Sequence, residues 1–226
     1  MTADELYQQA FRAEIAGFQP GSLCDVGCGA GGLLAHARSL GIAATGIEPD
    51  AGRAAEAANL DIRQGTAEAL PFPDGAFDLV TFENALHHVT DIASALAEAM
   101  RVARRAVVII DPWFDLSIPS QRVGDRLERW LKALDRMGGM VHWDPIPAGE
   151  ITAGCRGARS ITIRHLLTLT PMSPQVFADL ASRADRCKDK GAYRSSAMDA
   201  EIAAIHAEFQ RTGITEAGAL LATIGK

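Results

Sequence analysis

The sequence lacks the features that mark membrane, secreted or zinc-binding proteins. No apolar run approaches the roughly 18 residues that span a bilayer. The opening residues Met-Thr-Ala-Asp-Glu-Leu have neither the basic nor the apolar region of a signal peptide. The chain has four cysteines and no C-x-x-C pair, which argues against a zinc site; Cys24 and Cys28 are expected to be buried small hydrophobes. We therefore expect a cytoplasmic protein with no bound metal and no membrane partner.

An excess of positive charge is also absent. The 226 residues include 22 Lys and Arg against 28 Asp and Glu, which gives a net charge of −6. Nucleic-acid binding usually needs a basic face that neutralises phosphates, so we expect no nucleic-acid partner. The length suffices for one α/β domain with a large core.

What the sequence does have is a glycine-rich turn. Residues 23–33 read Leu-Cys-Asp-Val-Gly-Cys-Gly-Ala-Gly-Gly-Leu. A short apolar strand, 23–26, precedes the glycines, and an alanine-rich stretch of helical character, 33–40, follows them. Strand, turn and helix in this order begin a βαβ nucleotide-binding unit. Glycine suits the turn because it accepts positive φ and lets a ligand approach the backbone, and the helix N-terminus offers unpaired N–H groups.

Two kinds of nucleotide fit such a turn. Gly27, Gly29 and Gly32 satisfy G-x-G-x-x-G, the dinucleotide fingerprint. Asp25 stands two residues before the first of these glycines, where its carboxylate would repel a pyrophosphate and attract a ligand with a cationic end. The turn therefore favours a cationic nucleotide, and an NAD-dependent dehydrogenase is the alternative.

Three motifs resemble those of one family. The run D-V-G-C-G-A-G at 25–31 resembles the first motif of the class I S-adenosylmethionine (SAM) dependent methyltransferases. Residues 65–80 resemble the segment G-D-A-x-x-L-P-F-x-D-x-x-F-D-x-V of its small-molecule members, including the ubiquinone and menaquinone biosynthesis type, and residues 86–89 resemble their L-H-H-V. The resemblance implies methyl transfer from SAM to a small molecule, with S-adenosylhomocysteine (SAH) as the product.

The resemblance also implies a set of cofactor contacts. In the family the acid before the glycines faces the methionine ammonium group, and here that acid is Asp25. Glu48, at the end of the expected second strand, would accept hydrogen bonds from the ribose; it is expected at the edge of the cleft, where its loss should barely change stability. Thr66, which replaces the usual aspartate, and Ala67 would contact adenine. The full implied set is Asp25, Gly27, Cys28, Gly29, Gly31, Glu48, Pro49, Thr66, Ala67, Glu68, Glu83 and Asn84.

Hydrophobic periodicity and turn residues predict alternating strands and helices along the chain. We expect an α/β fold: a Rossmann-like, seven-stranded, mostly parallel sheet with helices on both faces and a small helical lid. Residues 1–226 would form a single SAM-binding domain, with lid insertions at about 112–157 and 171–212. The expected strands are 23–26, 42–47, 60–63, 77–82, 106–110, 160–170 and 220–224, the last antiparallel at or near the sheet edge; the expected helices are 3–17, 33–40, 49–58, 92–102, 123–134, 173–185 and 196–211.

Aromatic and methionine side chains gather in the first of these insertions. Trp113, Phe114, Met140 and Trp143 are the expected acceptor contacts, with the filling of a satellite core as the alternative. An imidazole titrates near neutrality, so His142 is the first candidate for a general base and His88 the second. We expect O- or N-methylation of a small molecule; a noncatalytic SAM-fold binding protein is a further alternative.

Overall fold

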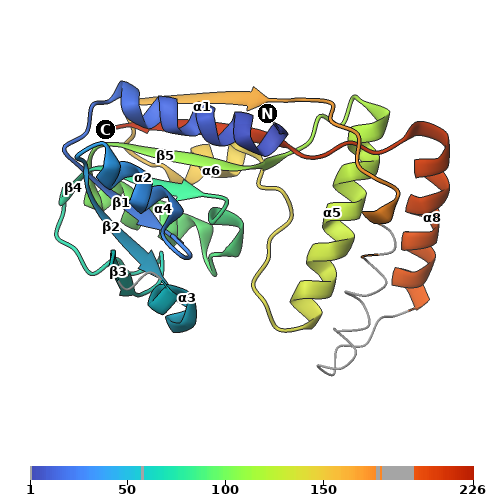
Figure 1. Cartoon of the computed structure of the whole chain (residues 1–226), viewed down its shortest axis with the longest axis horizontal. Coiled ribbons are helices and arrows are strands. Elements are labelled where there is room, and N and C mark those ends of the chain that lie inside the picture. Colours follow the sequence, from blue (N-terminus) through green and yellow to red (C-terminus); the bar gives the residue numbers. More distant parts are fainter. Residues whose placement is uncertain (1, 57–58, 177–178, 180–195) are drawn as a thin grey trace. The chain divides into compact units, whose positions relative to one another are not determined.

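The protein is described here by a computed structural model, which covers residues 2–56, 59–176, 179 and 196–226. Its centre is a seven-stranded sheet with the strand order β3-β2-β1-β4-β5-β7-β6 (Figure 1). This confirms the predicted fold class. The strands are β1 Ser22–Val26, β2 Ala43–Glu48, β3 Asp61–Gln64, β4 Phe77–Glu83, β5 Ala103–Trp113, β6 Ser160–Leu166 and β7 Gly218–Gly225.

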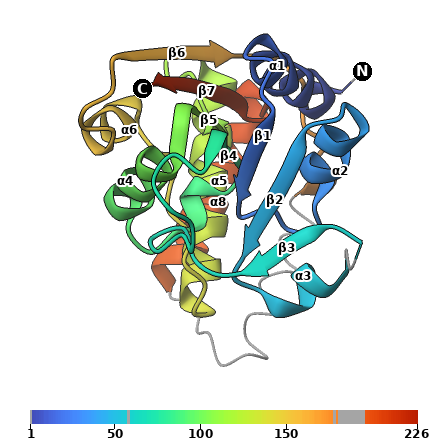
Figure 2. The ribbon, with the colours of Figure 1, turned by 90° about the vertical axis from the view of Figure 1, so that its left-hand side faces the viewer.

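The middle of the sheet is parallel and buried. β1 pairs in parallel with β2 on one side and with β4 on the other, and β4 pairs in parallel with β5. Because helices cover both faces of such a sheet, its strands read as nearly continuous apolar runs, and residues 23–26 of β1 are all buried. Figure 2 shows α1 and α2 on one face and α4 and α6 on the other.

Two helices begin at residues whose side chains satisfy exposed N–H groups. The side chain of Thr2 accepts a hydrogen bond from Glu5 N at the start of α1, and Asp91 accepts from Ala93 N and Ser94 N at the start of α4. The described helices are α1 Ala3–Gly17, α2 Gly32–Ser39, α3 Ala51–Glu56, the short 3-10 helix η1 Leu86–His88, α4 Ile92–Val102, α5 Pro119–Met137, α6 Ala148–Gly154 and α8 Ser196–Thr212.

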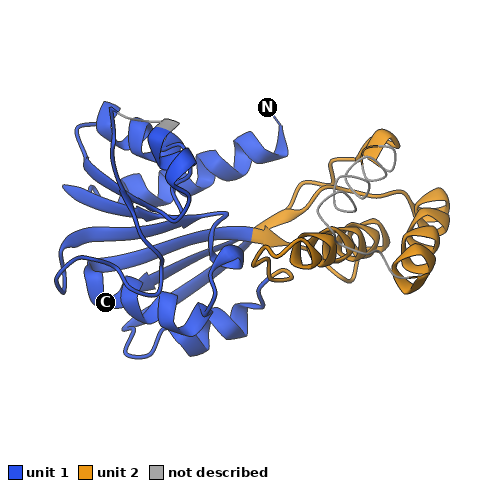
Figure 3. Cartoon of the chain, turned by 90° about the horizontal axis from the view of Figure 1, so that it is seen from below, with its two compact units in different colours: residues 1–111, 146–165, 220–226 blue, residues 112–145, 166–219 orange. Residues whose placement is uncertain are grey.

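The chain divides into two compact units (Figure 3). The first unit comprises residues 1–111, 146–165 and 220–226, and the second comprises 112–145 and 166–219. In the second unit α5 and α8 pack around a small apolar core, and the indole Nε1 of Trp130 donates to Met198 O at 2.8 Å. Buried members of this core are Val123, Leu127, Trp130, Leu134, Ile205 and Ile214.

The last strand runs antiparallel to β6, as predicted. Gly225 lies against Ser160 while Gly218 lies against Leu166, so the residue numbers on the two strands run in opposite directions. β7 lies between β5 and β6, one position in from the edge.

One predicted strand boundary was wrong and one helix was missed, for identifiable reasons. β5 begins at Ala103 and not at residue 106, because Arg104 and Arg105 are outward-facing strand residues, and not the end of a helix; Arg104 donates to Asp78 Oδ1 at 2.8 Å. Helix α6 was not predicted, because its glycine-rich sequence has low helix propensity. It packs closely on α4, since a Cβ added at Gly154 would lie 2.5 Å from Leu96 Cδ1. Most of the helix expected at 173–185 and the end of the one expected at 49–58 lie outside the described residues.

Candidate functional site

The glycine turn after β1 has the backbone geometry that the sequence predicted. Gly27, Gly29 and Gly31 have φ values of 73°, 53° and 80°, in the left-handed region that favours glycine. The N–H groups of Gly27 and Cys28 both donate to Ile47 O, at 2.8 and 3.1 Å, which ties the turn to the end of β2. A Cβ on Gly27 would lie 2.6 Å from the Cβ of Ala85. Position 27 therefore admits only glycine without a shift of the chain.

Glu48 fastens the same turn through its side chain. Its Oε2 accepts from Gly29 N at 2.9 Å and its Oε1 accepts from Asp50 N at 3.0 Å. The residue is 5% exposed, so it is buried and does not stand at an open edge as the sequence suggested. Because Glu48 accepts these two backbone hydrogen bonds, we expect the loss of its side chain to lower the stability of the folded protein. Each carboxylate oxygen has a second lone pair, so Glu48 can still accept hydrogen bonds from a ligand.

Asp25 is a buried acid at the end of β1. It is 2% exposed, and its Oδ1 accepts from the hydroxyl of Thr81 at 2.8 Å. Burial raises the pKa of Asp25 to about 8, the Thr81 hydrogen bond offsets part of this rise, and the carboxyls of Glu83 and Glu48 add to it. Without a cation nearby, this carboxyl is therefore protonated near neutrality.

The segment after β3 is held at both ends. Gly65 N donates to Glu48 O at 3.2 Å, and Glu68 Oε1 accepts from Thr90 N at 2.6 Å and from Asp91 N at 3.2 Å. Although burial opposes it, these and other hydrogen bonds hold the pKa of Glu68 below its ordinary value. The predicted adenine contacts, residues 66 and 67, thus lie between Glu48 and the start of α4, where Glu68 anchors the segment.

The exit from β4 completes this edge of the sheet. Asn84 has a φ of 52°, and its N–H donates to Ile110 O of β5 at 2.8 Å. Burial raises the pKa of Glu83, and the guanidinium of Arg12 acts in the opposite direction. The predicted cofactor residues on β1, β2 and β4 therefore converge at the carboxyl ends of neighbouring parallel strands, where open α/β sheets bind their ligands.

A second buried pair lies at the same edge, and the sequence analysis missed it. His87 Nδ1 is 2.6 Å from Asp111 Oδ1, with both side chains buried. The rings of His87 and His88 lie with their centroids 4.3 Å apart. A signal was present, because Asp111 directly follows the apolar run 106–110.

Comparison with known proteins identifies a known domain in part of the chain. Residues 24–110 match the family described as "Methyltransferase domain". This range contains every predicted cofactor residue.

Residues 24–110 therefore form a methyltransferase domain.

This match favours a methyltransferase over the dehydrogenase alternative. Over 47 residues the chain is 53% identical to the ubiquinone/menaquinone biosynthesis C-methyltransferase UbiE of Xanthomonas campestris, covering 21% of this chain and 19% of that protein. Over 130 residues it is 32% identical to the ajmaline N-methyltransferase of Rauvolfia serpentina, covering 51% and 45%. The chain thus spans less than half the length of these relatives.

A solved structure shows the same fold. The crystal structure of the YcgJ protein from Bacillus subtilis superposes with a TM-score of 0.62 and 18% identity, over 97% of this chain and 98% of that one. At this identity the likeness concerns the fold alone.

The predicted acceptor contacts all lie in the second unit. Phe114 is buried and packs on Gly124, where a Cβ would lie 2.8 Å from its ring. Met140 and Trp143 are half-exposed, in the segment that follows α5. His142 Nδ1 lies 2.8 Å from Asp135 Oδ2. Trp113, Phe114, Met140, His142 and Trp143 therefore belong to one unit, and His88 belongs to the other.

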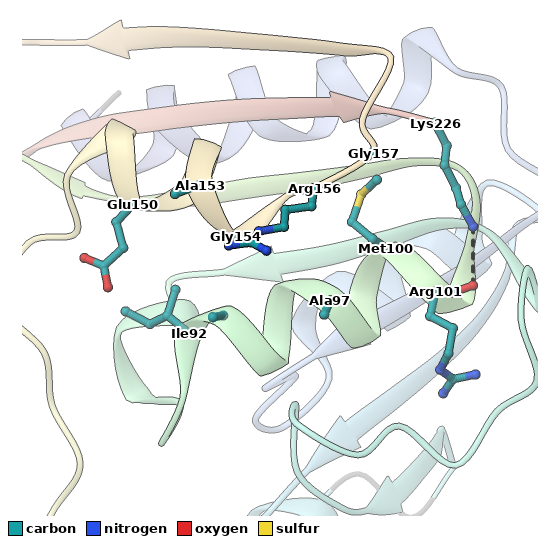
Figure 4. Close-up of a pocket in the computed structure, with 11 residues that line it drawn as sticks. Ile92, Ala97, Met100, Arg101, Glu150, Ala153, Gly154, Arg156, Gly157 and Lys226 are labelled. Atoms are coloured by element: carbon teal, nitrogen blue, oxygen red, sulfur yellow. Dashed lines mark hydrogen bonds between the residues drawn. The ribbon is translucent and has the colours of Figure 1, made fainter.

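A separate pocket of about 610 Å³ lies between α4 and α6 (Figure 4). Ile92 and Met100 contribute apolar surface, and none of its lining residues belongs to the cofactor set. Lys226 Nζ donates to Ala103 O at 2.8 Å and to Arg101 O at 3.4 Å (Figure 4). This lysine therefore anchors the end of the chain to α4 and β5.

Across the residues that the structure covers, no helix combines the length and the apolar character needed to cross a membrane.

Proposed function

We propose that the chain transfers the methyl group of SAM to a small-molecule acceptor, at a nitrogen or an oxygen atom. The observation that carries this proposal is the convergence of three acids at the glycine turn: Asp25 and Glu48, which are buried, and Glu83, which is half-buried. A site with this excess of carboxyls suits a cofactor that bears both an ammonium and a sulfonium charge. It does not suit the pyrophosphate of a dinucleotide.

Each cofactor residue has a proposed role. Asp25 pairs with the methionine ammonium group, Glu48 accepts from the ribose hydroxyls, and Thr66 with Ala67 contacts adenine. Glu83 and Asn84 lie by the methionine end, and Cys28 and Pro49 flank the turn. When bound, SAM supplies an already activated methyl group, so the protein chiefly orients the reactants and excludes water.

The second unit is proposed to select the acceptor. Its half-exposed Met140 and Trp143 offer apolar contact surface, and apolar pockets with a few polar groups are the usual design for small ligands. An amine is one supported acceptor class, because one matched relative is named as an N-methyltransferase. His142 and His88 are the histidines that the sequence proposes as general bases.

The test is methyl transfer by the purified full chain from SAM carrying a radiolabelled methyl group. The probe acceptors are histamine and tryptamine as amines and catechol as a phenol. We expect label in at least one probe, together with stoichiometric SAH. Binding of SAM without transfer to any amine or phenol would instead favour a noncatalytic SAM-binding protein.

The pKa of Asp25 predicts that SAM binding depends on pH. Its native value of about 8 exceeds the unfolded value of about 3.9, so the ligand-free native chain holds a proton that the unfolded chain releases. Stability without ligand should therefore fall as the pH rises from about 4 to about 8. Binding of the ammonium group favours the ionised carboxylate, so SAM affinity should rise between about pH 6 and 7.5, by up to about tenfold per pH unit.

Titration calorimetry in buffers of different ionisation enthalpy measures this proton release directly. Asp25→Asn should remove the pH dependence, weaken binding and stabilise the ligand-free protein above neutrality. If wild type and Asp25→Asn bind SAM with the same pH profile, Asp25 does not face the ammonium group.

A further inference from the structure

The His87–Asp111 pair lies at the edge of the sheet where the cofactor residues converge. β4 and β5 are parallel neighbours, with Glu83 in register with Ile110. Asn84 N donates to Ile110 O, so the chain that leaves β4 is held against β5 one residue before Asp111. The short helix η1 then places the imidazole of His87 within 2.6 Å of the Asp111 carboxylate. The contact therefore follows from two adjacent strand ends.

We propose that His87 accepts the proton that the acceptor loses during methyl transfer, and that Asp111 positions His87 for this step. The proposal rests on the proposed function and names the residues that carry out its proton transfer. It differs from the sequence-based candidates, which were His142 and His88.

The geometry assigns a role to each atom of the pair. Asp111 Oδ1 accepts a hydrogen bond from Nδ1–H of His87, which puts the lone pair of the neutral ring on Nε2. As the acceptor nitrogen or oxygen bonds to the methyl carbon, the carbon–sulfur bond breaks and its electron pair stays on sulfur. The proton of the acceptor passes to Nε2, and the resulting imidazolium is stabilised by the Asp111 carboxylate.

Both members of the pair are buried. The side chains of His87 and Asp111 are only 8% and 3% exposed. Among the residues that the structure describes, Asp111 Oδ2 is buried and receives no hydrogen bond. A buried carboxylate with one of its oxygens unsatisfied is costly, and a positive charge on the neighbouring ring lowers that cost. Asp111 from β5 and His88 from η1 are titratable groups of the first unit that face His87.

Two rival histidines differ from His87 in their surroundings. His88 is exposed and its ring lies against that of His87. The carboxylate of Asp111 is paired with His87. His142 has its own carboxylate, Asp135, at 2.8 Å, but this pair belongs to the second unit. The two histidine–aspartate pairs can therefore be compared by the same substitution, Asp→Asn, which keeps the shape of the side chain.

The kinetic test uses Asp111→Asn, His87→Gln and Asp135→Asn with histamine, tryptamine and catechol as probe acceptors. Loss of a general base costs about 10²–10⁴ in rate, so Asp111→Asn and His87→Gln should lower kcat by about that factor. The acceptor KM should stay within about threefold, and the rise of kcat with pH through neutrality should disappear. Exposed Asp74→Asn is the matched control and should keep the wild-type rate and profile.

Titration with SAH separates this proposal from the proposed function. SAH should bind the Asp111→Asn and His87→Gln proteins within about threefold of wild type, under roughly 0.7 kcal/mol. Normal SAH binding with unchanged kcat and pH profile would overturn the role of the pair and leave the proposed function standing. Loss of rate and of the pH dependence in Asp135→Asn alone would give the role to His142.

A measurement on the wild-type protein decides the question if a variant does not fold or if no probe is methylated. Long-range ¹H–¹⁵N spectra of the SAH complex at about pH 8 report which ring nitrogen of each histidine carries the proton. For His87 we expect the proton on Nδ1 and none on Nε2. A proton fixed on Nε2 across the whole pH range would overturn the proposal.

Discussion

Gly27→Ala should destabilise the protein by about 2–5 kcal/mol and abolish SAM binding. A residue with a Cβ pays about 1–2 kcal/mol in the left-handed conformation, and Gly27 has a φ of 73°. The new Cβ would also meet the Cβ of Ala85 at 2.6 Å, and overpacking typically costs about 1–3 kcal/mol. The chain could relieve that contact only by moving the glycine turn, and this movement would disturb the hydrogen bonds that its N–H groups donate to Ile47 O. Urea unfolding and calorimetry with SAM measure the two effects.

Gly75→Ala is the matched control for the cost of placing alanine in a left-handed backbone conformation. Gly75 has a φ of 62°, and a Cβ there would meet no atom within 4 Å. Its substitution should cost only about 1–2 kcal/mol and leave SAM binding intact. Equal losses of stability in the two variants would show that the contact with Ala85 does not constrain the turn.

Glu48→Ala should weaken SAM binding at least about tenfold and also lower the stability of the ligand-free protein. Hydrogen bonds to a charged group contribute about 1.5–3 kcal/mol, which at roughly 1.4 kcal/mol per tenfold gives the loss of affinity. The N–H groups of Gly29 and Asp50 lose their common acceptor, and we expect this to cost about 1–3 kcal/mol of folding free energy. Calorimetry with SAM and urea unfolding without it separate the two contributions.

Glu98→Ala tests whether the loss of affinity is specific to Glu48. Glu98 Oε2 also accepts a backbone hydrogen bond, from Leu70 N at 2.9 Å, and its carboxylate pairs with Arg101. Glu98→Ala should therefore lose stability while keeping SAM affinity. If the two variants bind SAM equally well, Glu48 does not hold the ribose.

Local sequence signals predicted the parts of the molecule that depend on neighbouring residues. The glycine turn and the helices at 3–17 and 92–102 each follow from residue types within a few positions of one another. Asp25 and Glu48 could be placed near strand ends because Asp25 lies in the apolar strand 23–26 and Glu48 directly follows the expected strand 42–47.

Features that depend on register between distant segments could not be predicted in the same way. His87 and Asp111 meet only because β4 and β5 pair with Glu83 opposite Ile110. The contact between Glu48 and Gly29 N depends likewise on where β2 ends beside β1. A single sequence shows that these residues are polar and follow apolar strands, but the distances between their atoms come from the folded sheet.

The most direct test of the account is calorimetric titration of the full chain with SAM and, separately, with NAD at the same pH. The central claim is that the acids at the carboxyl ends of β1, β2 and β4 select a cationic nucleotide. We predict one SAM site per chain that Asp25→Asn and Glu48→Ala both weaken, and no measurable heat from NAD. Binding of NAD with no response to SAM, or SAM binding that neither substitution changes, would contradict the account.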